Sequence, residues 1–76
     1  MREHDRVVLT SDLPQTGLKA GDVGTVVHVH KGGGAFEVEF VALDGDTAAV
    51  ATVAASQLRS VSHADMTHAR PRELAA

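Results

Sequence analysis

The fold is decided by one stretch of the chain, residues 25–41, which reads TVVHVHKGGGAFEVEFV. Its first six residues are dense in β-branched side chains, which favour a strand over a helix. Near its end, two glutamates alternate with apolar residues, so the two kinds of side chain take opposite faces of a strand. The three central glycines permit a reversal, because glycine adopts positive φ angles without strain. We therefore predict a β-hairpin with strands at residues 25–30 and 35–41, whose buried side chains include Val27, Phe36, Val38 and Phe40.

Three further strands are predicted outside this hairpin. Residues 6–10 are short and β-branched, and the next two residues favour a turn. Residues 47–53 follow an Asp-Gly turn and combine alanines with β-branched residues, so we prefer a strand to a helix there. A single helical turn at residues 55–58 then leads to a short strand at residues 59–61. We expect Leu58 and Val61 to close the core.

Residues 12–22 contain one proline and two glycines, which makes them too irregular for a helix or a strand. We predict a long loop that folds back on the core through Leu13 and Leu18. This order of elements predicts an all-β fold, a small five-stranded SH3-like barrel with a long first loop and a one-turn helix before the last strand. The barrel would span residues 1–62, and residues 63–76 would form a polar C-terminal tail with one helical turn near residues 64–68.

Composition limits the classes of protein to which the chain can belong. Its 76 residues suffice for one domain, and its 43% hydrophobic and 22% charged residues are ordinary for a folded protein. It has no cysteine, which excludes a disulfide or a thiolate zinc site, and its first residues lack the apolar core of a signal peptide. We therefore expect a cytoplasmic protein. The net charge of −3 disfavours nonspecific binding of nucleic acid.

Three blocks of sequence occur in order: VVLTSDLP at residues 7–14, GLKAGDVGTVV at residues 17–27 and FEVEF at residues 36–40. Over roughly residues 5–61 this pattern resembles an uncharacterised bacterial family of small proteins, the domain of unknown function numbered four-nine-two-six. The resemblance names no activity. It implies a small bacterial protein that works with a neighbouring protein, in a toxin–antitoxin or similar pair.

Two histidines, His28 and His30, are two residues apart on a predicted strand, so their side chains project from one face and two imidazoles could share a metal ion. Two more ligands would be needed, from His63, His68 or His4. We expect instead a solvated face on which the histidines pair with glutamates across the hairpin. We therefore predict no metal and no cofactor.

No pattern for catalysis is present: the glycine run is not followed by a helix, and no serine has the context of an activated nucleophile. We expect a protein that is not an enzyme but a noncatalytic protein-interaction module, antitoxin-like or an accessory partner of a neighbouring protein. A homodimer through a sheet edge is expected when that partner is missing. The alternatives are a nucleic-acid-binding barrel and a histidine-based metal-binding protein. The residues expected to contact a partner are Asp12, Leu13, Pro14, Leu18, His28 and His30.

Overall fold

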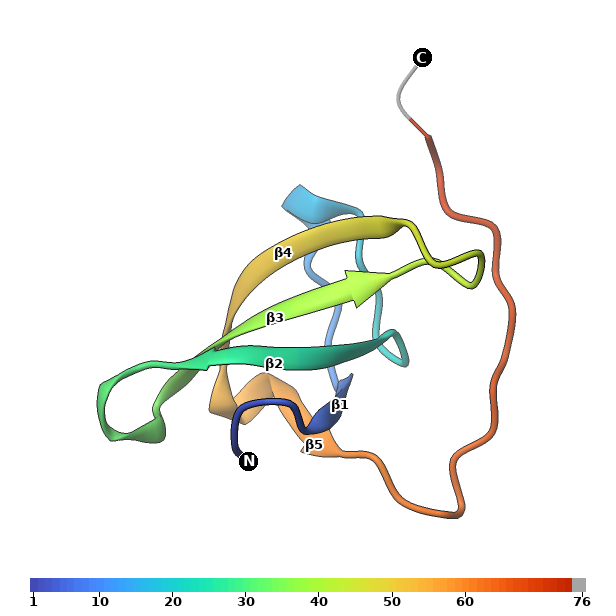
Figure 1. Cartoon of the computed structure of the whole chain (residues 1–76). Helices are drawn as coiled ribbons and strands as arrows, with labels where there is room; N and C mark the ends of the chain where they lie inside the picture. Colours follow the sequence, from blue (N-terminus) through green and yellow to red (C-terminus); the bar gives the residue numbers. More distant parts are fainter. Residues whose placement is uncertain (75–76) are drawn as a thin grey trace.

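In the computed structural model, residues 1–74 are described, and they form one five-stranded antiparallel sheet (Figure 1). The strands are β1 (Arg6–Leu9), β2 (Val23–Val29), β3 (Ala35–Val41), β4 (Thr47–Ala54) and β5 (Leu58–Ser60). Their order across the sheet is β4-β3-β2-β1-β5, so β4 and β5 are its two edges. Three short 3-10 turns join them: η1 (Pro14–Thr16), η2 (Lys31–Gly33) and η3 (Ala55–Gln57). Within residues 1–74, no helix has the length and apolar character needed to cross a membrane.

The all-β prediction is confirmed, with five strands, a long first loop and a single helical turn before the last strand. β3 has the predicted bounds, and the other strands differ from prediction by one or two residues at their ends. Both hairpins form: β2 pairs with β3, and β3 pairs with β4. In the first hairpin turn, Gly32 and Gly33 adopt φ angles of 80° and 73°, which explains the need for glycine there. The closer assignment to SH3-like barrels stays a prediction.

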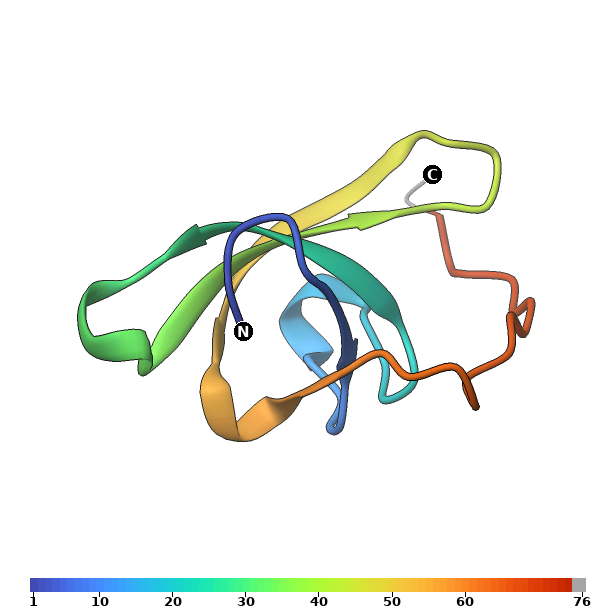
Figure 2. The ribbon, with the colours of Figure 1, turned by 60° about the horizontal axis from the view of Figure 1, so that its bottom comes forward.

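The core lies against the concave face of the curved sheet, which is visible from the side in Figure 2. The first loop and the start of β5 close this face, because Leu18 and Leu58 are buried in the core cluster and Leu13 packs against the same cluster. Phe36, Val38 and Phe40 are buried, as the alternation predicted. The other buried members of the cluster are Val7, Leu9, Val26 and Val53.

The prediction that Val27 is buried is wrong, because its side chain is 39% exposed. Val26 lies opposite Val38, but His28 lies opposite Glu37, so β2 has a bulge between Val26 and His28 and the register shifts there. The bulge reverses the alternation along β2. Val26 is therefore fully buried, and Val27 faces solvent.

The expected role of Val61 is also wrong. The last strand ends at Ser60, and Val61 is 38% exposed, so Leu58 closes the core alone at this end of the chain. The predicted helical turn near residues 64–68 is absent; a turn at residues 63–64 is followed by an extended chain. Local hydrogen bonds explain why the helical turn does not form, because the carboxylate of Asp65 accepts a hydrogen bond from the amide of Ser62 at 2.8 Å. The last two residues of the predicted 63–76 tail lie outside the described residues.

Candidate functional site

The first loop, residues 10–22, holds two carboxylates in fixed positions. The Asp12 carboxylate accepts a hydrogen bond from the amide of Ala20 at 2.8 Å, and the Asp22 carboxylate accepts one from the amide of Lys19 at 2.9 Å. Leu13 and Leu18 pair as an isolated antiparallel bridge that closes the loop between them. Aspartate side chains of this kind favour turns because they satisfy nearby backbone amides. The loop therefore presents ordered carboxylates at the surface.

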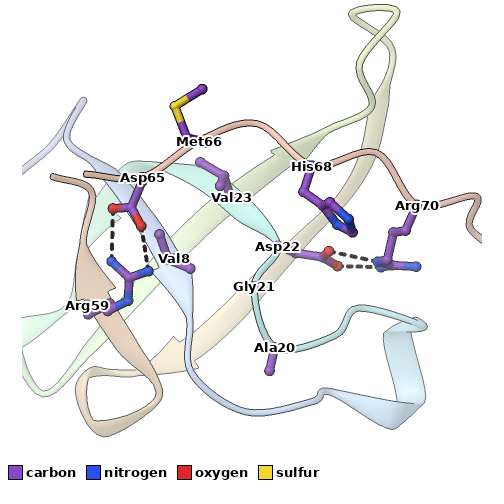
Figure 3. Close-up of a pocket in the computed structure, with 10 residues that line it drawn as sticks. All are labelled: Val8, Ala20, Gly21, Asp22, Val23, Arg59, Asp65, Met66, His68 and Arg70. Atoms are coloured by element: carbon purple, nitrogen blue, oxygen red, sulfur yellow. Dashed lines mark hydrogen bonds and ion pairs between the residues drawn. The ribbon is translucent and has the colours of Figure 1, made fainter. Parts of the chain in front are cut away.

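After β5 the chain turns back and runs beside Val8 of β1 and the start of β2. A bidentate ion pair fixes this turn, because the Arg59 guanidinium donates to both carboxylate oxygens of Asp65, at 2.7 and 3.0 Å (Figure 3). Residues 66–73, which we call the C-terminal arm, then run past the start of β2. The Arg70 guanidinium donates hydrogen bonds from Nε and Nη2 to the two oxygens of Asp22, the first at 2.9 Å. Two ion pairs thus join the tail to the folded domain.

The charges in these pairs stabilise one another. Burial pushes the pKa of Asp22 upward, but the hydrogen bonds from Arg70 and from the Lys19 amide outweigh it, so the pKa is lowered. Hydrogen bonds from Arg59 and from the Ser62 amide hold the pKa of Asp65 far below its usual range. The pKa of each arginine is raised in turn by its aspartate. The charges of Arg59 and Arg70 are therefore partly neutralised within the molecule.

Val8 of β1 lies beneath the tail. Its side chain is only 4% exposed, yet it does not belong to the core cluster. It pairs with Val23 on one side and with Arg59 on the other, in a strand whose neighbours Val7 and Leu9 point into the core. Val8 therefore lies on the outer face of the sheet, the face opposite the core, where Figure 3 shows it between Arg59, Val23 and the arm.

Two hollows lie beneath the arm. The first has a volume of about 280 Å³ and is bounded by the outer face of β1 and β2, the two ion pairs, Met66 and His68. The second has a volume of about 510 Å³ and lies between the first loop and residues 70–73. Its walls include Asp12, Pro14 and Leu18. The arm therefore spans recesses that it does not fill.

Among the predicted contact residues, Asp12, Pro14 and Leu18 are thus brought together beside the arm. Leu13 is directed mainly to the core instead. His28 and His30 are separate from this group, because they lie at the end of β2, whereas the loop joins its beginning at Val23.

The two histidines do project from one face, as predicted. Their ring centroids are 5.1 Å apart, with the rings nearly perpendicular. His30 Nε2 lies 2.6 Å from an oxygen of Glu37. The Glu37 carboxylate also accepts a hydrogen bond from the Thr52 hydroxyl. The pairing with a glutamate across the hairpin is therefore confirmed, and contacts with His30 and then Thr52 lower the pKa of Glu37. Within residues 1–74, no group of three or more potential ligands is arranged to hold a metal ion.

The two edges of the sheet differ. β5 is three residues long and is followed at once by the turn that the Arg59–Asp65 pair fixes. β4 is eight residues long, and all eight are alanine, threonine or valine. Val50, in the middle of β4, is 56% exposed. One edge is thus short and flanked by charges, and the other is long, apolar and uncharged.

Sequence reasoning missed the residues that attach the tail: Val8, Asp22, Arg59, Asp65 and Arg70. Arg70 and Asp22 are 48 positions apart, and no spacing rule links them. The sequence contains one indication of such a covered surface. Val8 is an apolar residue between Val7 and Leu9, and if these two face the core, Val8 faces the opposite side of the strand.

The comparison with protein families bears on the domain alone. A family model described as "Domain of unknown function (DUF4926)" matches residues 3–60. The chain belongs to this family. The DUF4926 match ends where β5 ends, so the turn at residues 62–65 and the arm lie outside it. No curated protein and no solved structure matches the chain.

Proposed function

We propose that this DUF4926 domain is a noncatalytic protein-interaction module that accepts an extended strand of another protein chain at the edge of β4. The native occupant is a neighbouring bacterial protein, for which the module acts as an antitoxin-like or accessory partner in the cytoplasm. A second copy of the chain occupies the edge when that partner is missing.

The observation that carries the proposal is the composition of β4. An edge strand exposes a row of unpaired backbone N–H and C=O groups, and proteins usually blunt such edges with charges, prolines or short strands. β4 has no charged residue and no proline along its eight residues. The strand at the other edge of the sheet, β5, is short and flanked by charges. The two edges therefore differ, and β4 is the one that lacks these protections.

The side chains of β4 also suit pairing with a second copy. An antiparallel pair centred on Val50 places it opposite its own equivalent and sets Ala48 opposite Thr52. No like charges meet in that arrangement, and β-branched pairs across strands are favourable. The nearest carboxylates on β3 are already engaged, because Glu39 accepts the Thr47 hydroxyl at 2.8 Å and Glu37 accepts Thr52. A pair of single strands buries less than the roughly 1,200 Å² of a standard interface, so we expect the association to be weak.

The alternatives have less support. The net charge of −3 disfavours nonspecific binding of nucleic acid, and two of the seven lysines and arginines, Arg59 and Arg70, are paired with aspartates. A metal site at His28 and His30 would have to displace the contacts that Glu37 already makes.

The test is co-purification of the tagged chain from its own cells, using three versions: the parent, Val50→Lys and Leu43→Lys. The Leu43 change adds the same charge at an exposed residue in the loop between β3 and β4, away from the edge. We expect a stoichiometric protein with the parent and with Leu43→Lys, and its loss with Val50→Lys. Equal recovery with all three would reject β4 as the binding edge.

A further inference from the structure

Asp22 and Arg70 contact each other as a binding site and its bound ligand would, with Asp22 in the site and Arg70 as the ligand. Asp22 is oriented by the Lys19 amide, independently of Arg70. The guanidinium meets this carboxylate with two parallel hydrogen bonds, the geometry that gives arginine–carboxylate pairs their strength and selectivity. The carbonyl of Gly17 lies 3.5 Å from Nη2, and Asp12 adds a second negative charge nearby.

The receptor and the ligand belong to different parts of the chain. Asp12, Gly17 and Asp22 lie inside the region that matches DUF4926, and Arg70 lies outside it. The surface therefore belongs to the region that matches the family, and the arm that occupies it lies outside that match.

The arm is held by few contacts. Over the residues that the structure describes, the backbone of residues 66–73 makes no hydrogen bond to the domain, and Arg70 is the one arm residue whose side chain does. Met66 is 85% exposed although it lies over the outer face. Two hollows lie between the arm and the domain. Because one side chain provides all of these hydrogen bonds, another segment that offers the same guanidinium can displace the arm.

We infer that the first loop is a binding site for the arginine of an extended peptide segment, that the arm fills this site within the same chain, and that an arginine-bearing segment of a partner protein binds there by displacing the arm. The surface lies next to Pro14 and Leu18, and Pro71 of the arm lines the same hollow. The segment that fits best therefore has a proline after its arginine. This site is separate from the β4 edge, so the failure of either proposal leaves the other standing.

The test measures binding of a fluorescein-labelled peptide with the sequence of residues 66–74 to the full chain by fluorescence anisotropy. The receptors are the parent, Arg70→Ala, and Arg70→Ala combined with Asp22→Asn. The first variant removes the guanidinium that competes within the chain, and the second also removes the carboxylate that receives it. Thermal melting of each receptor checks that the sheet remains folded, which we expect because both residues lie outside the core cluster.

We expect the peptide to bind Arg70→Ala about three- to tenfold more tightly than the parent, because a tethered arm competes at an effective concentration near 1 mM. A peptide with alanine in place of Arg70 should lose this binding, and one with alanine in place of Arg72 should keep it. The added Asp22→Asn change should abolish it. Three results would each overturn the inference: no binding to Arg70→Ala up to about 1 mM peptide, equal affinity for Arg70→Ala and the parent, or equal affinity of the two alanine peptides. If the double variant does not fold, the amide chemical shifts of Gly17 and Lys19 in Arg70→Ala test the same point. We expect these shifts to change when the peptide with the parent sequence is added and to stay constant when the peptide with alanine in place of Arg70 is added.

Discussion

Gly24 and Phe40 lie directly opposite each other across β2 and β3, and the space between the two strands has no room for a side chain at position 24. A Cβ atom there would lie 2.5 Å from Cγ1 of Val38 and 2.9 Å from the carbonyl oxygen of Glu39. The backbone at Gly24 does not have a positive φ. Glycine is therefore required at position 24 by the close approach of β3.

Replacing Gly24 with alanine should lower the free energy of unfolding by about 1–3 kcal/mol, because the methyl group must displace buried neighbours. Gly34→Ala is the matched control, since a Cβ there meets nothing within 4 Å and the φ angle of −80° suits alanine. Urea denaturation of both variants checks this. A Gly24→Ala variant as stable as Gly34→Ala would show that the strands do not approach as closely as described.

Phe40 is the largest fully buried side chain, and Phe40→Ala should cost roughly 3–5 kcal/mol, enough to unfold much of so small a domain. Leu43→Ala, at a residue that is 76% exposed, should melt close to the parent. Thermal melting followed by circular dichroism measures both. If Phe40→Ala melts within a degree or two of the parent, the assignment of the core face is wrong.

The ion pairs of the tail should make stability depend on acid. The pKa of Asp22 and that of Asp65 are lowered in the folded protein, so their stabilising effect is fully present above the ordinary aspartate pKa of about 4 and is lost as the pH falls through the lower folded values. The difference in melting temperature between the parent and an Asp22→Asn, Asp65→Asn variant should therefore be constant from about pH 7 to pH 5 and shrink below about pH 4. A difference that persists unchanged into the acid range would contradict the assigned pairs.

We expect weak zinc binding or none. His30 and Thr52 already engage Glu37, and two imidazoles alone leave a zinc ion short of ligands. Calorimetric titration with zinc at neutral pH measures this directly. Submicromolar affinity that disappears in a His28→Ala, His30→Ala variant would prove the expectation wrong.

The parts of the fold that were predictable from the sequence depend on local rules. The bounds of β3 follow from its alternation, and the turns follow from glycine and Asp-Gly, whose conformations are set by neighbouring residues. The bulge in β2 has no such signal. A strand with Val26, Val27, His28 and Val29 can place either valine of the first pair inward, and the partner strand decides which.

The candidate site was predictable only in part, for a similar reason. The loop residues Asp12, Pro14 and Leu18 were identified because a long loop with apolar residues indicates a surface that folds on the core. Their relation to the arm depends on the ion pair between Asp22 and Arg70, which only the folded chain brings together. From the sequence alone, a charged side chain is assumed to be solvated, because its partner in the folded protein is unknown.

Light scattering of the purified chain at tens of micromolar tests the central claim most directly, because an open β4 edge should pair with a second copy when no other partner is present. We predict more than one chain per particle for the parent and for Leu43→Lys, and a single chain for Val50→Lys, in which lysines would face each other at the centre of the paired strands. A strictly monomeric mass for the parent across that range, with no partner recovered from cells, would contradict the claim.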